Sequence, residues 1–233
     1  MSAPAIVVLH GANGSAGEME PLAAPLRAHG RVIAHDLPGH GGRELPQRLS
    51  IAGAAEDVIA RLDREGIERA FVVGYSLGGY EALYLARHFP QRIAGVVGIG
   101  VKYVFDPETI KYWIYLAQPE RLARPGNPRA AEMLAAHGPY WKAVTIATSV
   151  LFGDLGAKPP LTEDDLRAIE RPVMLVNSNR DAITKWDETL ALGKIIPNAR
   201  LVMFYGLAHP LRNVPVTRIG EAIGQWMREV VPA

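Results

Sequence analysis

The fold is decided by the stretch Gly74-Tyr75-Ser76-Leu77-Gly78-Gly79. An apolar run, 70–73, precedes it and a run with helical character, 80–87, follows it, so the stretch predicts a strand, an abrupt turn and a helix. A serine on so tight a turn needs glycine at positions 74 and 78, because a Cβ atom at either would collide across the bend. The hydroxyl of Ser76 should therefore stand clear of the strand, at a helix N-terminus whose unpaired N–H groups favour negative charge.

The composition is that of an ordinary soluble domain. Of the 233 residues, 48% are hydrophobic and 21% are charged, which excludes a disordered or fibrous chain. The formal charge is +1 and basic residues are interspersed with acidic ones, so neither nucleic acid nor a membrane is an expected partner. No apolar run is long enough to span a bilayer. There is no cysteine, which excludes disulfides and a Cys nucleophile, and we predict a cytoplasmic location.

Segments with strand and helix character alternate along most of the chain. Apolar runs typical of buried parallel strands lie at 5–9, 31–35, 93–100, 172–177 and 199–205. Helical spacing is found at 18–26, 51–64, 185–195 and 214–230. Together with the strand before Ser76, these segments predict an α/β protein with a mostly parallel sheet of about six strands and right-handed crossovers. The strand at 31–35 should lie at an exposed edge.

The serine turn resembles the nucleophile elbow of the α/β-hydrolases. This resemblance implies a three-layer α/β-hydrolase fold with helices on both faces of the sheet. Relatives usually begin with an antiparallel strand pair, and only five residues precede Ile6, so that pair is expected to be missing. The interval 101–171 breaks the alternation and holds most of the aromatic residues. By resemblance, 102–170 is a helical lid (cap) inserted into a core made of 1–101 and 171–233.

A serine nucleophile needs a base and a third group that orients the base. The family order is serine, acid, histidine. Of the seven histidines only His209 follows the fifth strand, and Asp181 lies in the loop directly after that strand. Asp106 is an alternative acid, because some relatives carry theirs after the preceding strand, although Asp106 also suits the start of a helix. The predicted catalytic residues are Ser76, Asp181 and His209.

Backbone N–H groups are expected to hold the oxyanion. One should be that of Leu77, and by resemblance to the family's His-Gly-x motif the second is that of Ala12. Asn13 is the less expected donor, but its side chain could reach a substrate carbonyl. His10 precedes this loop in the wrong order for a triad base and is interpreted as a loop organiser.

Further contacts are expected from the lid, because aromatic side chains often line ligand pockets. The candidates for substrate binding are Tyr112, Trp113, Tyr140 and Trp141. The cluster of His35, Asp36 and His40 is not interpreted as a metal site, since relatives carry a similar loop as structure and further ligands are missing. We predict no metal and no cofactor.

The sequence thus predicts a serine carboxylesterase that forms an acyl-enzyme on a small-to-medium ester. Ser76 would attack the carbonyl, His209 would transfer the proton and Asp181 would orient the imidazole. The same triad could serve a thioester, a lactone, a carbon–carbon bond next to a ketone, or peracid formation. A hydrolase-like receptor with slow turnover is the remaining alternative. The expected partner is a small-molecule ester, and the chain is a monomer or a homodimer.

Overall fold

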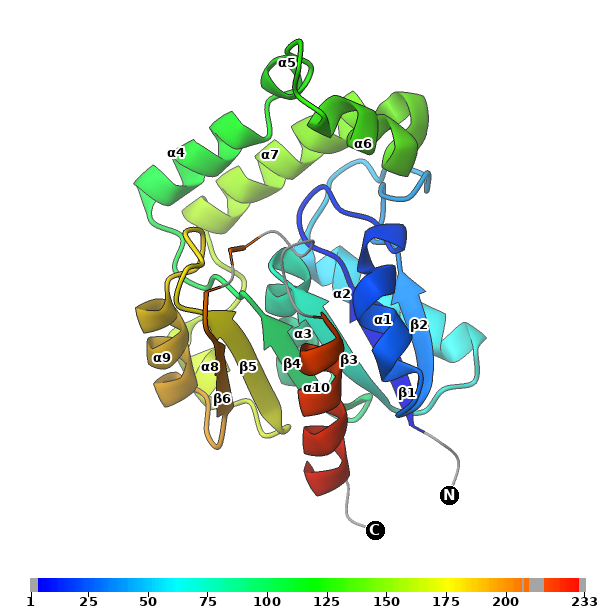
Figure 1. Cartoon of the computed structure of the whole chain (residues 1–233), viewed down its shortest axis with the longest axis vertical. Helices are drawn as coiled ribbons and strands as arrows, with labels where there is room; N and C mark the ends of the chain where they lie inside the picture. The colour runs from blue at the N-terminus through cyan, green and yellow to red at the C-terminus, as the bar shows by residue number, and fades with distance from the viewer. Residues whose placement is uncertain (1–3, 207, 210–215, 231–233) are drawn as a thin grey trace.

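The computed structural model describes residues 4–206, 208–209 and 216–230. Its centre is a six-stranded parallel sheet with the order β2-β1-β3-β4-β5-β6 (Figure 1). The strands are β1 (Ala5–Leu9), β2 (Arg31–His35), β3 (Ala70–Tyr75), β4 (Ile93–Ile99), β5 (Val173–Ser178) and β6 (Arg200–Phe204). The predicted six-stranded parallel sheet and the edge position of β2 are both confirmed.

Side chains on successive strand residues point to opposite faces of the sheet and enter two separate cores. Ile6 and Val8 pack on one face with the helices η1 (Gly17–Met19), α1 (Glu20–Leu26) and α10 (Val216–Val230). Val7 and Leu9 pack on the other face, with the helices α2 (Ile51–Arg64), α3 (Leu77–His88) and α9 (Trp186–Ile195). Both faces are therefore covered, which explains why these strands are continuous apolar runs.

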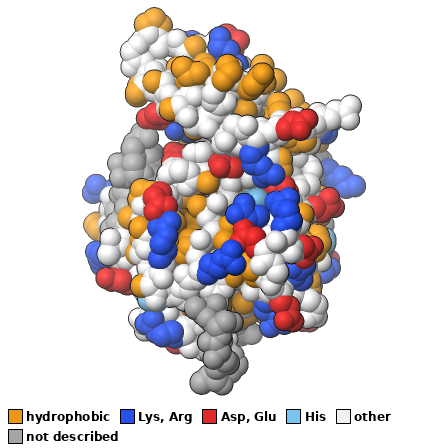
Figure 2. Space-filling view, turned by 90° about the vertical axis from the view of Figure 1, so that its right-hand side faces the viewer, with side chains coloured by type: hydrophobic (Ala, Val, Ile, Leu, Met, Phe, Trp, Pro, Cys, Tyr) orange, Lys and Arg blue, Asp and Glu red, His pale blue; other side chains and the backbone are white. Residues whose placement is uncertain are grey.

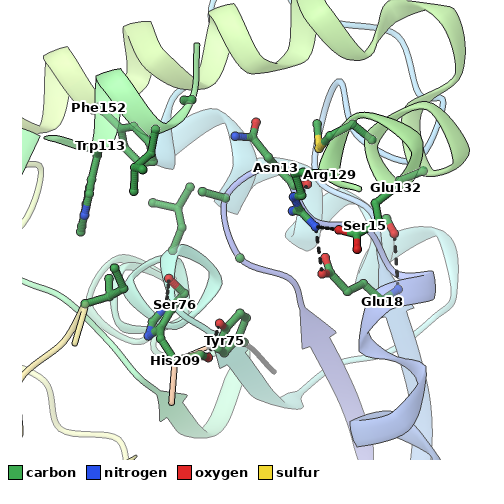
Figure 3. A pocket seen from close by; sticks show the side chains of 18 of the residues that line it. Asn13, Ser15, Glu18, Tyr75, Ser76, Trp113, Arg129, Glu132, Phe152 and His209 are labelled. Atoms are coloured by element: carbon green, nitrogen blue, oxygen red, sulfur yellow. Dashed lines mark hydrogen bonds and ion pairs between the residues drawn. The ribbon is translucent and has the colours of Figure 1, made fainter. Parts of the chain in front are cut away.

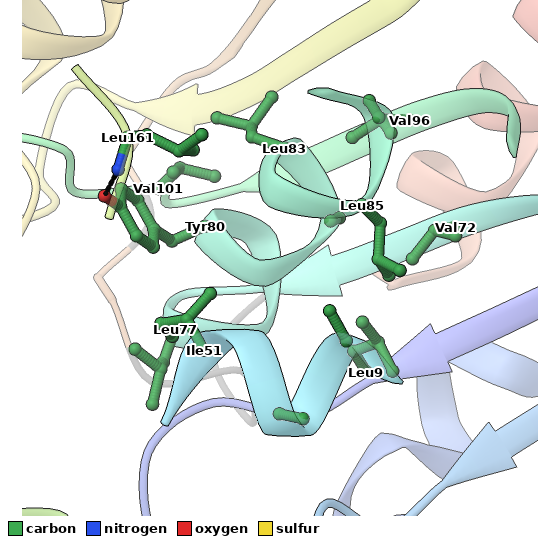
Figure 4. Packing of buried hydrophobic residues seen from close by; sticks show 14 of the residues in the cluster. Leu9, Ile51, Val72, Leu77, Tyr80, Leu83, Leu85, Val96, Val101 and Leu161 are labelled. Atoms are coloured by element: carbon green, nitrogen blue, oxygen red, sulfur yellow. Dashed lines mark hydrogen bonds between the residues drawn. The ribbon is translucent and has the colours of Figure 1, made fainter. Parts of the chain in front are cut away.

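Helix α3 is the central helix of its layer. Its Leu83 and Leu85 are fully buried in the same core as Val72 and Val96 of the sheet (Figure 4), and burying each leucine contributes about 2 kcal/mol. The Tyr80 hydroxyl accepts a hydrogen bond of 3.1 Å from the N–H of Leu161. The helix that begins behind Ser76 is thus fixed on several sides.

The interval between β4 and β5 is helical. It contains α4 (Pro107–Leu116), α5 (Pro119–Leu122), α6 (Arg129–His137), η2 (Gly138–Tyr140), α7 (Trp141–Ala157) and α8 (Glu163–Arg167). The helices α4 to α7, called here the upper helices, lie above the carboxyl end of the sheet (Figure 1). Helix α8 instead contacts α3 and α9, although it lies inside the interval predicted as a lid.

The surface differs between the upper helices and the rest of the molecule. On the face in Figure 2, acidic and basic side chains are interspersed over the lower body, while hydrophobic side chains gather on the upper helices. Exposed hydrophobic residues of these helices include Tyr112, Tyr115, Leu134, Tyr140, Ile146 and Val150. Within the described part of the chain, no helix combines the length and the apolar character needed to cross a bilayer.

Candidate active site

Ser76 occupies a strained turn between β3 and α3. Its backbone has φ 53° and ψ −117°, a conformation that non-glycine residues rarely adopt. A Cβ atom on Gly74 would overlap the carbonyl oxygen of Gly78 across the bend, as the sequence predicts. A Cβ atom on Gly78 would instead lie 2.5 Å from the carbonyl oxygen of His10, in the loop after β1. Both positions therefore require glycine. Gly74 lets the turn itself close, and Gly78 lets the turn pack against the loop after β1.

The three predicted catalytic side chains lie in one hydrogen-bonded series. His209 Nδ1 lies 2.7 Å from Asp181 Oδ2. Its Nε2 lies 3.1 Å from Ser76 Oγ (Figure 3). The second carboxylate oxygen of Asp181 accepts from the N–H groups of Ile183, at 2.9 Å, and Thr184, at 2.8 Å. These bonds fix the carboxylate so that Oδ2 faces the imidazole.

The alternative acid has another role in the structure. Asp106 is exposed and caps helix α4 by accepting from the N–H of Thr109 at 2.9 Å and from its hydroxyl at 2.6 Å. These bonds lower the pKa of Asp106. Of the two candidate acids, only Asp181 lies beside His209.

Two residues that the sequence did not single out as site residues support His209: Tyr75 bonds to it, and Gly100 leaves room for its ring. The Tyr75 hydroxyl donates to the His209 carbonyl at 2.6 Å, and the two rings lie 5.2 Å apart. Gly100 has φ +60°, and a Cβ atom there would lie 3.2 Å from His209 Cε1 and 3.3 Å from Asp181 Oδ2. The only sequence signal for Gly100 is a glycine at the end of the fourth apolar run.

Leu77 and Ala12, the two predicted oxyanion donors, line the cavity together with Ser76. Leu77 is the first residue of α3, where N–H groups have no acceptor within the helix. Within the described residues, neither the Leu77 N–H nor the Ala12 N–H donates to another protein group. Both are thus available to a bound oxyanion.

His10 fixes the peptide that carries the Ala12 N–H. Its Nε2 accepts from the N–H of Leu37 at 3.1 Å, so Nδ1 carries the proton and donates to the Gly11 carbonyl at 2.7 Å. The same carbonyl accepts from the Gly14 N–H at 3.0 Å. Burial lowers the pKa of His10 to about 4, which keeps this neutral form near pH 7. The position supports the interpretation of His10 as a loop organiser.

The loop after β1 is also tied to the upper helices. The Asn13 carbonyl accepts from Arg129 Nη2 at 3.2 Å and from His137 Nε2 at 3.3 Å, both on α6. His137 Nδ1 in turn accepts from the N–H of Gly41 at 3.1 Å. Helix α6 therefore holds the segment that contains Ala12.

A cavity of about 1000 Å³ opens above Ser76, between the loop after β1 and the upper helices. Of the predicted substrate contacts, Asn13 and Trp113 line it. Tyr112 and Tyr140 point to solvent, with 52% and 73% of their surface exposed. Trp141 is buried in a small cluster of its own with Leu122 and Met133. These last three predicted residues lie outside the lining because only one side of each upper helix faces the cavity.

The side chains of His35, Asp36 and His40 have separate partners. His35 Nε2 lies 2.7 Å from an oxygen of Asp57, and Asp36 accepts from the N–H of Ala16 at 2.7 Å. His40 Nδ1 donates to the carbonyl of Pro38 at 3.0 Å. Within the described ranges, no three His, Asp or Glu side chains are grouped as metal ligands.

Comparisons with known proteins agree with this architecture. Over 95 residues the chain is 36% identical to 3-oxoadipate enol-lactonase 1 of Acinetobacter baylyi, a match that covers 41% of this chain and 36% of that protein. It is 28% identical over 222 residues to 2-hydroxymuconate semialdehyde hydrolase of Pseudomonas putida, covering 85% and 77% of the two chains.

A solved structure, a thermophilic esterase of Thermogutta terrifontis, shares the fold with a TM-score of 0.78 at 23% identity, over 98% of this chain and 91% of that one. Residues 6–218 match the model of the Alpha/beta hydrolase family. This match covers most of the chain, and the chain therefore belongs to the alpha/beta hydrolase family.

Proposed function

We propose that the chain is a serine hydrolase that cleaves small-to-medium carboxylic esters through an acyl-enzyme. Family membership and the names of its relatives support a hydrolase. The observation that carries the finer proposal is the hydrogen-bonded series from Asp181 through His209 to Ser76, which ends at the cavity. A hydroxyl next to an oriented imidazole is the arrangement that makes serine a nucleophile.

Each group has a chemical step in this proposal. Ser76 Oγ attacks the ester carbonyl while His209 Nε2 accepts its proton, and the developing oxyanion accepts from the N–H groups of Leu77 and Ala12. His209 then donates the proton to the leaving alcohol. Water, deprotonated by the same imidazole, attacks the acyl group. The bond to Ser76 Oγ then breaks, His209 returns the proton to the serine oxygen, and the acid is released. Asp181 holds the imidazole and stabilises its cationic form throughout.

We further propose that the upper helices serve as the lid of this site, with 1–101 and 171–233 as the core. Their position above the cavity and the bonds from α6 to the Asn13 carbonyl support this role. A closed cover excludes water, which strengthens the electrostatic interactions that stabilise the oxyanion.

A lactone or a carbon–carbon bond next to a ketone is the second candidate substrate. It is favoured by the names of the two relatives, an enol-lactonase and a semialdehyde hydrolase. The same serine, histidine and oxyanion donors would act on these substrates. Initial rates on matched esters, thioesters, lactones and β-diketones would separate the classes.

The proposal is tested with Ser76→Ala and a matched control, Ser149→Ala. Ser149 lies on α7 and donates to the Thr145 carbonyl, outside the cavity lining. Hydrolysis of 4-nitrophenyl butyrate should fall at least a thousandfold in Ser76→Ala and stay unchanged in the control. A fluorophosphonate should label the wild type and the control but not Ser76→Ala. Turnover by Ser76→Ala at the wild-type rate would refute the proposal.

Turnover also separates an enzyme from a receptor that keeps the triad. A labelled Ser76 with turnover below roughly one per minute on all substrates, against about 10 per second for a median enzyme, would favour a receptor.

A further inference from the structure

The cavity has two chemically different sides. Trp113 and Phe152 lie above Ser76 on one side, and a group of polar residues lies on the other (Figure 3). The polar residues come from the loop after β1, from η1 and from α6. We call this group the polar arm: Asn13, Ser15, Glu18, Arg129 and Glu132.

Arg129 is the cation of the polar arm, but its charge is already matched. Its Nη1 lies 2.8 Å from an oxygen of Glu132 and 3.6 Å from an oxygen of Glu18, and its Nη2 donates to the Asn13 carbonyl. A substrate carboxylate would have to displace one of these partners. The arm also carries two carboxylates against one guanidinium, so it has a net negative charge.

The second cation at the cavity is neutralised as well. Lys102 Nζ lies 2.6 Å from Glu188 Oε2, and both side chains are only 12% exposed. The other oxygen of Glu188 accepts from the N–H groups of Tyr103 and Val104. Among the described residues that line the cavity, Arg129 is the only arginine and Lys102 is the only lysine. Each is bound to a carboxylate.

Acceptors, in contrast, are in excess in the polar arm. The side-chain oxygen of Asn13 is buried and has no hydrogen-bond partner among the described residues. The carboxylates of Glu18 and Glu132 lie nearby and are partly exposed. A buried acceptor without a donor is costly, and the two partly exposed carboxylates add acceptors that a ligand in the cavity can reach.

We propose that the polar arm selects esters that carry a hydrogen-bond donor, an ammonium or hydroxyl group, and disfavours esters that carry a carboxylate at the same place. This inference rests on the proposed function, because it names the substrate class of the same site. Its physical basis is the net negative charge of the polar arm together with its two partly exposed carboxylates. The discrimination is electrostatic and should weaken as salt is added.

The test uses two matched series of esters. In the first, 4-nitrophenyl esters of a six-carbon acid end in a methyl, hydroxyl, ammonium or carboxylate group. In the second, butyrate esters of a four-carbon alcohol carry the same four ends. The two series place the variable group on the acyl side and on the alcohol side. In at least one of them we expect kcat/KM of the ammonium ester to exceed that of the carboxylate ester at least tenfold, with the hydroxyl ester between them.

Variants locate the discrimination in the polar arm. Glu18→Gln and Glu132→Gln should each lower the ratio of ammonium to carboxylate kcat/KM about fivefold, because each removes one partly exposed negative charge. Glu163→Gln, on the exposed surface of α8, is the matched control and should leave the ratio unchanged. Thermal melting of each variant checks that it is folded.

Two results would overturn the inference: a wild type that prefers the carboxylate ester in both series, or a ratio that neither variant changes. The methyl-ended esters keep this failure separate from that of the proposed function. If Ser76 turns over the methyl-ended esters while the ratio does not respond, only the polar arm is refuted. If Ser76→Ala turns them over at the wild-type rate, the proposed function fails as well.

Discussion

Glu81 should make the stability of the protein fall as pH rises. It lies on α3, five positions after Ser76, and is fully buried. Neither of its carboxyl oxygens has a hydrogen-bond partner within the described residues. Burial, with a smaller contribution from the negative charge of Asp57, raises the pKa of Glu81 well above 4.5. Glu81 is therefore protonated in the folded protein at pH values at which it is ionised in the unfolded chain.

The sign and size of the effect follow from linkage. Below pH 4.5 Glu81 is protonated in both the folded and the unfolded state, so its titration does not affect stability. Above pH 4.5 the unfolded state loses the proton while the folded state keeps it, so stability falls by about 1.4 kcal/mol per pH unit until the pKa of the folded state is passed. Glu81→Gln keeps the shape of the side chain and removes the titration. Between pH 5.5 and 6.5, the free energy of unfolding of Glu81→Gln should therefore rise relative to wild type, by up to about 1.4 kcal/mol.

Urea unfolding at the two pH values measures this difference. The exposed Glu68→Gln is the control for the loss of one surface carboxylate, and its difference from wild type is measured at the same two pH values. If the difference between Glu81→Gln and wild type is the same at both pH values, Glu81 is not a buried neutral acid and the reasoning is refuted.

Three further variants probe the support of the site. Gly100→Ala should lower kcat at least tenfold with little change in KM, because its Cβ would press on His209. The control Gly153→Ala, in open space on α7, should leave kcat unchanged. Equal kcat values of the two variants in steady-state assays would contradict this prediction. Tyr75→Phe should lower kcat about fivefold through loss of the bond to the His209 carbonyl, and an unchanged kcat would show that this bond does not position the ring. His137→Ala removes two hydrogen bonds between α6 and the core. It should therefore lower the free energy of unfolding by about 2 kcal/mol and lower kcat on uncharged esters. If urea unfolding shows no loss of stability, these bonds do not tie α6 to the core.

The sheet and the meeting of the three catalytic candidates could be predicted from sequence because both depend on local patterns. Continuous apolar runs such as 93–99 occur where a strand is covered on both faces. Asp181 and His209 each follow a strand, and the carboxyl ends of parallel strands meet at one edge of the sheet. The choice of Asp181 and His209 among the loop residues rests on the order serine, acid, histidine that the resemblance to the α/β-hydrolases implies.

The positions of the aromatic side chains and of Gly100 depend on packing between segments that are far apart in the sequence. Tyr112 and Trp113 are adjacent, and only the rotation of α4 against its neighbours decides that Trp113 faces the cavity. Trp141 is buried, but in a separate cluster at the start of α7. Gly100 lies so close to His209 and Asp181 that a Cβ atom there would press on both, although the three residues are far apart in the chain. Such contacts appear only when the helices and loops are placed in space.

The central claim, that Ser76 carries the acyl group, is tested most directly by mass spectrometry of protein quenched during turnover of 4-nitrophenyl butyrate. The peptide that contains Ser76 should gain one butyryl group, and the modification should disappear once the ester is consumed. Turnover without an acyl group on this peptide, or with the acyl group on another residue, would contradict the claim.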